Sequence, residues 1–226
     1  MRALAMAGIA GLLAFIGFRA YAAQGEAAPS SDAGASESGA QVYYAQDTGG
    51  PWSDFQDAVR STIEGIIPGD GGDVQAIASE PNVQAFLRVI RAGEGTAGAD
   101  GYRTMFGGGL FESYADHPRV AVTAKLGGRL LTSTAAGAYQ FLSRTWDEAA
   151  AALSLQDFSP ASQDAAAVFL IRRRGALADV RAGRFDAAVS KLGREWASLP
   201  GSPYGQPTRT IEQARAVYES EGGSYA

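Results

Sequence analysis

The sequence predicts an α+β fold that is mostly helical, and three observations lead to this prediction. Before residue 94 and after residue 135, apolar residues recur at the three- and four-residue spacing of a helix face. Between Thr96 and Leu131 that spacing disappears and glycine and aromatic residues are frequent, which indicates loops with a small strand ribbon. Hydrophobic residues make up 46% of the 226-residue chain, enough for one sizeable core and an appendage.

The first residues differ in character from the rest of the chain. Residues 3–18 carry no charge and are flanked by Arg2 and Arg19. As a helix they would span roughly 24 Å, somewhat less than a bilayer core of roughly 30 Å. We expect residues 1–21 to form a retained transmembrane anchor. A cleaved signal segment is the first alternative, because residues 20–22 resemble a small-x-small cleavage site, and a buried helix is the second.

Residues 22–78 are interpreted as an acidic, flexible linker. Residues 24–80 hold ten acidic side chains and one basic side chain, and residues 22–50 are too small and polar to bury a core. Apolar residues at helical spacing predict a short amphipathic helix near residues 53–67, which Pro68 and Gly69 end.

Residues 79–226 are expected to form the folded domain. Ser79 is the expected N-cap of its first helix, which ends where two glycines enclose Glu94 and leave that acid at the exposed helix end. Helical spacing then predicts further helices over residues 135–141, 143–153, 159–173, 177–181, 185–196 and 210–221.

Several classes of chemistry are excluded by composition. The chain has no cysteine and a single histidine, His117, so a thiolate metal site is impossible and a catalytic zinc site is disfavoured. Neither a GxSxG elbow nor a phosphate-binding GxxxxGK motif occurs. Residues 81–226 carry a net charge of +2, which suits an anionic polymer but is too weak for a nucleic-acid footprint. No cofactor and no metal are expected.

Acid chemistry remains, and Glu94 is the candidate. Cleaving a glycosidic bond requires a carboxylic acid that donates a proton to a poor leaving group. A carboxyl at a helix C-terminus lies near the negative end of the helix dipole, which favours its protonated form. The alternative from the residues alone is an ordinary solvated glutamate at a helix end.

From about Val83 to Gly223 the chain resembles the bacteriophage lambda endolysin family. The matching motifs occur in order: AGEGT at 92–96, GGLF at 108–111, YADHPR at 114–119, STAAGAYQ at 133–140, DFSP at 157–160, SQD at 162–164, RGAL at 174–177, WASLPG at 196–201 and YGQ at 204–206. The resemblance implies a lysozyme-like fold with a helical lobe and a small β region flanking a glycan groove, and Glu94 as catalytic acid. Ala138 departs from the pattern, because the lambda member has arginine there.

The implied groove suggests substrate-binding residues. They are Tyr139, Gln140, Ser133, Tyr204 and Gln206. For Tyr139 and Gln140, ordinary helix packing is an equal alternative. Trp196 is assigned to the core and His117 to a structural role in holding the β region.

The resemblance also implies a reaction with one essential carboxylate, since Asp100, Glu112 and Asp116 match no known second catalytic position. The expected activity is that of a lytic transglycosylase on peptidoglycan, which forms a 1,6-anhydro sugar. Hydrolysis by a muramidase and a non-catalytic virion or glycan-binding protein are the alternatives. Expected partners are peptidoglycan strands, a membrane through residues 3–18 and other virion proteins. The expected location is a virion or inner membrane with the domain facing peptidoglycan, or else the periplasm.

Overall fold

The computed structural model describes residues 43–44, 71–126, 129–203 and 208–226. Its helices are α2 (Gly71–Ala78), α3 (Pro81–Gly93), α4 (Ser143–Leu153), α5 (Pro160–Arg173), α6 (Leu177–Arg181), α7 (Phe185–Leu192) and α8 (Ile211–Ser220), with short 3-10 helices η1 (Gly101–Arg103) and η2 (Phe106–Gly108). Its strands are β1 (Tyr43–Tyr44), β2 (Val122–Leu126) and β3 (Arg129–Ser133).

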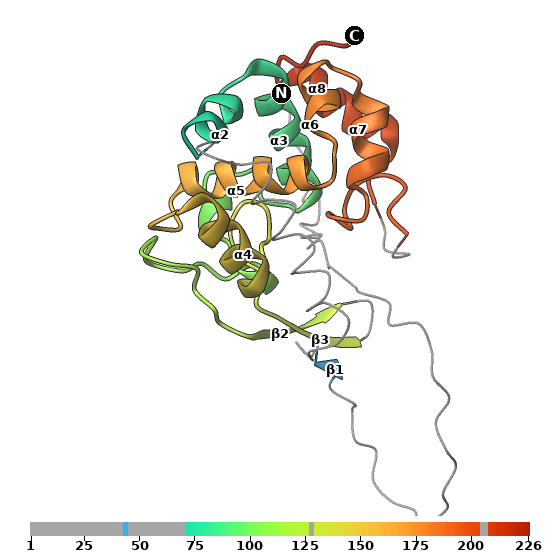
Figure 1. Ribbon diagram of the computed structural model, residues 1–226. Coiled ribbons are helices and arrows are strands. Elements are labelled where there is room, and N and C mark those ends of the chain that lie inside the picture. The colour runs from blue at the N-terminus through green and yellow to red at the C-terminus, as the bar shows by residue number, and fades with distance from the viewer. Residues whose placement is uncertain (1–42, 45–70, 127–128, 204–207) are drawn as a thin grey trace, which may run out of the picture.

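The helical lobe is built around α5, which crosses its centre (Figure 1). Ser159 caps this helix by accepting a hydrogen bond from the Ser162 amide, and Pro160 occupies the first turn. Helix α5 has buried residues on all sides between Ser162 and Ile171, as expected for a helix enclosed by others. Helices α2, α3, α4 and α6 all contact it.

The β region lies at the lower end of the molecule, away from α6, α7 and α8 (Figure 1). Strands β2 and β3 form an antiparallel hairpin in which Val122 pairs with Ser133, and β1 pairs with β3 in parallel. A small second hydrophobic cluster, centred on Phe106 and Ala135, packs against the hairpin. The predicted combination of a helical lobe and a small β region is therefore confirmed.

Two of the predicted helices, 143–153 and 177–181, have the bounds of α4 and α6. The helix predicted over 185–196 stops at Leu192, with Gly193 as its C-cap. The helix predicted over 135–141 is wrong. Gly137 has a φ of +79° and Gln140 a φ of +49°, and both values lie in the left-handed region that interrupts a helix.

The folded domain begins before Ser79, where the sequence analysis placed its start. Helix α2 buries Val74, Ile77 and Ala78 in the main core and packs against α5. The Ser79 hydroxyl donates back to the Gln75 carbonyl, and Glu80 is the N-cap of α3. Residues 71–78 therefore belong to the domain and not to the linker.

Several predictions concern residues outside the described ranges. These are the anchor at residues 1–21, the parts of the linker at residues 22–42 and 45–70, and the short helix near residues 53–67 within that linker. Among the helices that the structure describes, none is long and apolar enough to cross a membrane.

Candidate active site

The candidate acid occupies the end of α3, where the chain leaves the helix in a tight hydrogen-bonded turn. The Thr96 amide donates to the Arg91 carbonyl (2.9 Å), and the Gly95 amide donates to the Ala92 carbonyl (3.4 Å). Gly95 has a φ of +73°, which completes the glycine-dependent helix ending known as the Schellman motif. Glu94 is the C-cap of this helix, as the flanking glycines predict.

Glu94 is buried, whereas the sequence analysis expected an exposed side chain. Only 2% of the residue is exposed, and the loop after α7 packs against the end of α3. From that loop the Ser198 hydroxyl donates a hydrogen bond of 2.7 Å to Glu94 Oε1. A Cβ atom at Gly93 would lie 2.7 Å from Ser198 Oγ, so glycine at this position allows the two segments to approach.

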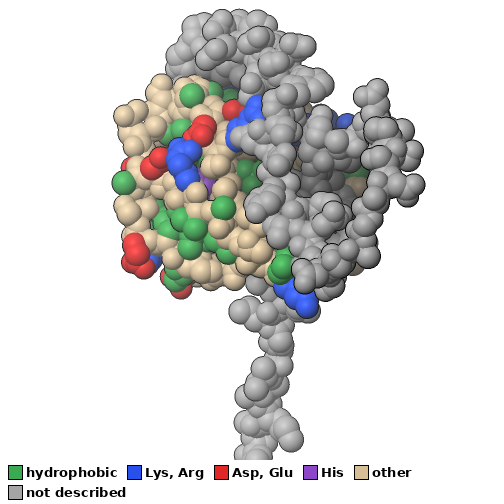
Figure 2. All heavy atoms as spheres, turned by 90° about the horizontal axis from the view of Figure 1, so that it is seen from below, with side chains coloured by type: hydrophobic (Ala, Val, Ile, Leu, Met, Phe, Trp, Pro, Cys, Tyr) green, Lys and Arg blue, Asp and Glu red, His purple; other side chains and the backbone are tan. Residues whose placement is uncertain are grey.

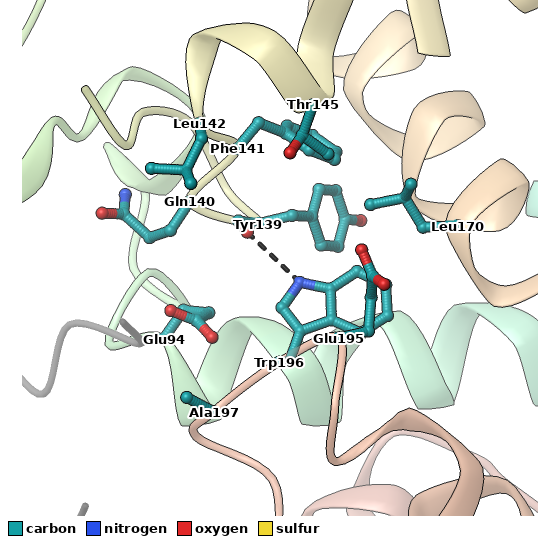
Figure 3. A pocket seen from close by; sticks show the side chains of 10 residues that line it. All are labelled: Glu94, Tyr139, Gln140, Phe141, Leu142, Thr145, Leu170, Glu195, Trp196 and Ala197. Carbon is teal, nitrogen blue, oxygen red and sulfur yellow. Dashed lines mark hydrogen bonds between the residues drawn. The ribbon is translucent and has the colours of Figure 1, made fainter. Parts of the chain in front are cut away.

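Glu94 lies at one side of a small pocket (Figure 3). The pocket encloses ≈ 10 Å³, room for about one water molecule. It is lined by Glu94, Tyr139, Gln140, Phe141, Leu142, Thr145, Leu170, Glu195, Trp196 and Ala197. A whole sugar ring is far larger than this space.

Gln140 is the second polar group on the Glu94 side of the pocket (Figure 3). Its backbone lies in the left-handed region, a strained conformation for a residue with a side chain. Its amide nitrogen donates to the carbonyls of Thr104 and Gly137, each at 3.0 Å. These two bonds fix the orientation of the side chain. The buried Oε1 atom has no protein partner and is available to a donor that enters the site.

A second carboxylate, Glu195, lines the same pocket but is engaged elsewhere. Its side chain is fully buried and accepts from Arg173 (3.1 Å) and Arg174 (2.7 Å). In Figure 3 the Trp196 indole lies between the Glu195 carboxylate and Glu94. Glu195 therefore ties this loop to the end of α5, and it does not face Glu94.

The Tyr139 residue is buried, which favours ordinary packing, the alternative to the expected substrate contact. Its side chain is 1% exposed, and its hydroxyl donates to Asp164 in the helical lobe. Its carbonyl accepts a hydrogen bond of 3.2 Å from Trp196 Nε1. Tyr139 thus contacts the site through its backbone, and its side chain lies in the core. Trp196 is buried, in agreement with its expected assignment to the core.

The remaining residues that were expected to bind substrate are Ser133, Tyr204 and Gln206. Ser133 ends β3, is buried, and its hydroxyl accepts from the Ala135 amide at 3.1 Å. It does not line the pocket around Glu94. Tyr204 and Gln206 lie outside the described residues.

His117 connects the segment that precedes β2 to Phe141, the residue after Gln140. Its Nε2 donates to the Phe141 carbonyl at 2.9 Å, and its Nδ1 accepts from the Arg119 amide at 3.1 Å. Burial lowers the pKa of His117, which favours the neutral ring that these two bonds require. Nearby, the Arg119 guanidinium bridges Asp116 and Asp147.

The described surface carries mixed charges. On the face shown in Figure 2, basic and acidic side chains lie in small groups next to one another. Within the described ranges, no group of three or more histidine, aspartate or glutamate residues is arranged to hold a metal ion.

Ser198 is a residue of the site that the sequence did not indicate. It lies 104 residues from Glu94, inside a motif that the resemblance had already matched. Gly93 was the available signal, because a glycine beside a catalytic acid can mark a close approach of another segment. That signal does not identify the approaching segment.

Solved structures share this fold. Bacteriophage lambda lysozyme in complex with a chitohexasaccharide matches with a TM-score of 0.60 and 39% identity, over 65% of this chain and 97% of that one. A second structure, lysozyme from bacteriophage lambda, gives a TM-score of 0.58 and 40% identity over the same shares. The domain therefore has a lysozyme-like fold.

The sequence comparisons name the family. The endolysin of Escherichia phage lambda is 42% identical over 147 residues, which is 62% of this chain and 91% of that protein. The endolysin of Escherichia phage P2 is 40% identical over 161 residues, 65% of this chain and 96% of that protein. A sequence model of the endolysin family matches residues 84–225. The chain belongs to the endolysin family, which confirms the resemblance seen in the motifs.

Proposed function

We propose that this domain cleaves the glycan strands of peptidoglycan, with Glu94 as the general acid. The observation that carries the proposal is a glutamate buried at a helix C-terminus and oriented by the Ser198 hydroxyl. A positioned carboxylic acid of this kind is what protonation of a glycosidic oxygen requires. The family membership and the chitohexasaccharide bound to the lambda lysozyme support a glycan as the substrate.

The reaction is proposed to be that of a lytic transglycosylase. Glu94 donates its proton to the oxygen that links C1 of N-acetylmuramic acid to the next sugar, and the C1–O bond breaks. The 6-hydroxyl oxygen of the same muramic acid then bonds to C1. The proton of that hydroxyl returns to the Glu94 carboxylate. The product is a 1,6-anhydro sugar, no water is consumed, and the acid is regenerated.

The engagement of the other carboxylates supports a single acid. Glu195 is held by Arg173 and Arg174, and Asp116 is held by Arg119 and Trp146. Glu112 is exposed and pairs with Arg103. Of these three, Glu195 alone lines the pocket with Glu94, and both of its carboxylate oxygens accept from arginines.

Among the expected binding residues, Gln140 is the one we assign to substrate contact. Its fixed and unpartnered Oε1 suits an N–H or O–H donor of the glycan. Contacts by Ser133, Tyr204 and Gln206 stay predictions.

The products decide the reaction type. Purified peptidoglycan digested by the full chain is expected to release muropeptides that end in anhydro-muramic acid, which mass spectrometry detects by the loss of one water per end. Reducing ends would instead identify a muramidase. Binding to peptidoglycan without release of soluble fragments would identify a non-catalytic glycan-binding protein.

Membrane attachment through residues 3–18 is proposed on the sequence alone, together with association with virion proteins. The uncharged run between Arg2 and Arg19 followed by an acidic linker supports it. The full-length chain is expected to float with membranes in a density gradient, whereas residues 71–226 alone should not. An intact full-length chain that stays at the bottom of the gradient would rule the anchor out.

A further inference from the structure

In the helical lobe, one carboxylate accepts hydrogen bonds from two tyrosines that come from different segments of the chain. Asp164 Oδ1, on α5, accepts a hydrogen bond of 2.8 Å from the Tyr102 hydroxyl and one of 2.5 Å from the Tyr139 hydroxyl. Tyr102 lies on η1, after Glu94 in the chain, and Tyr139 immediately precedes Gln140. The reaction proposed above uses none of these three residues.

From Tyr139 a continuous set of contacts reaches Glu94. The Tyr139 carbonyl accepts from Trp196 Nε1 at 3.2 Å. Trp196 stands two residues before Ser198, whose hydroxyl donates to Glu94 Oε1. The position of the Tyr139 backbone therefore helps to set the position of the donor to the acid.

From Tyr102 a second set of contacts reaches the segment that follows Glu94. The buried Arg91 guanidinium stacks on the Tyr102 ring, with 4.4 Å between its central carbon and the ring centroid. The same guanidinium donates to the Thr96 carbonyl at 3.1 Å. The Thr96 hydroxyl in turn donates to the Ala138 carbonyl at 2.5 Å, which closes a ring of contacts around the end of α3.

We propose that Asp164 is a positioning residue for this site: through Tyr139 and Tyr102 it holds Glu94, its donor Ser198 and the neighbouring Gln140 in reactive geometry. This inference rests on the proposed function. A carboxylate suits the task because it accepts two hydroxyl donors at one place, and bonds to a charged acceptor are stronger than neutral ones.

The cost of burying this carboxylate suggests a role beyond filling space. Burial raises the pKa of Asp164, and the hydrogen bonds from the two tyrosines oppose that rise. Burial and the adjacent Asp164 raise the pKa of Tyr102 to about 12, so its hydroxyl stays protonated and remains a donor. Apolar residues could fill the same space without this cost, but they would fix neither loop by directional bonds.

The test compares steady-state kinetics of single hydroxyl deletions on peptidoglycan. Tyr139→Phe and Tyr102→Phe are each expected to lower kcat about tenfold with KM changed less than twofold, because misplaced groups slow the chemical step more than they weaken binding. The double variant is expected to lose no more than Asp164→Ala, because both hydroxyls act through one acceptor. Asp164→Asn keeps Oδ1 as an acceptor and should recover most of the kcat that Asp164→Ala loses.

Tyr218→Phe is the matched control. Tyr218 is as buried as Tyr139, and its hydroxyl donates to the Ser224 carbonyl at the C-terminal tail, outside the site. It should lower the melting temperature by a similar amount and leave kcat unchanged. If the wild type is active and the Tyr139 and Tyr102 variants match Tyr218→Phe in kcat, the inference is overturned while the proposed function stands. These two variants decide the question even if Asp164→Ala fails to fold. An inactive wild type would overturn both.

Discussion

Glu94→Gln is expected to abolish glycan cleavage while leaving the fold intact. Glutamine has nearly the same shape, and its Oε1 can still accept the hydrogen bond that Ser198 donates to Glu94. It cannot donate a proton at neutral pH. Removing a positioned general acid typically costs on the order of 10²–10⁴ in rate, and here the same group is proposed to act as acid and then as base. We therefore expect a loss at or beyond the upper end of that range.

The measurement is release of soluble muropeptides, accompanied by a thermal melt. Asp100→Asn and Glu112→Gln serve as controls, because both residues are exposed and neither lines the pocket. Both should retain substantial activity. Ser198→Ala removes one donor to the acid and is expected to lower the rate on the order of 10- to 100-fold, since a hydrogen bond to a charged group contributes about 1.5–3 kcal/mol. An active Glu94→Gln protein with unchanged melting would refute the assignment of the acid.

The position of Glu94 at a helix end could be predicted from sequence because its signals are local. The glycines on either side of Glu94 end a helix, and the family motif around them is contiguous in the chain. The surroundings of Glu94 could not be predicted, because they come from residues far away in sequence. In the folded structure, loops bring Ser198, Gln140 and Trp196 close to the acid.

Tertiary contacts also explain the error over residues 135–141. The small and apolar residues of this segment recur at helical spacing. In the structure, however, the Ala138 amide donates to the Gln163 side chain and the Gly137 amide donates to the Thr104 carbonyl. A Cβ at Gly137 would lie 2.3 Å from Gln163 Oε1. The loop is fixed by partners on α5 and near η1, which outweigh a weak local preference for helix.

The same limitation applies to the start of the domain. The sequence of α2 begins with two glycines and follows an acidic stretch. Its apolar residues are Val74 and three residues of its second half, Ala76, Ile77 and Ala78. It therefore resembles linker when read alone. In the structure Val74 is 1% exposed and Ile77 is 3% exposed, both in the main core. The helix is stabilised by α5 and not by its own propensity.

Deleting α2 is accordingly expected to destabilise the domain severely. Full burial of a valine or isoleucine side chain contributes about 1.5–3 kcal/mol, so loss of Val74 and Ile77 together removes about 3–6 kcal/mol. Domains of this size are stable by about 5–15 kcal/mol, and each 1 kcal/mol corresponds to roughly 2–4 °C in melting temperature. A protein that begins at Ser79 should melt about 6–24 °C below one that begins at Gly71, or fail to fold.

Point substitutions within the longer protein separate the loss of core packing from the effect of a new chain end. Ile77→Ala should cost about 2–5 kcal/mol, because a buried isoleucine leaves both lost burial and a cavity. Gln75→Ala on the exposed side of the same helix should leave the melting temperature nearly unchanged. Differential scanning calorimetry of the four proteins decides the matter. If the protein that begins at Ser79 melts together with the one that begins at Gly71, α2 lies outside the cooperative unit and the original boundary at Ser79 is the right one.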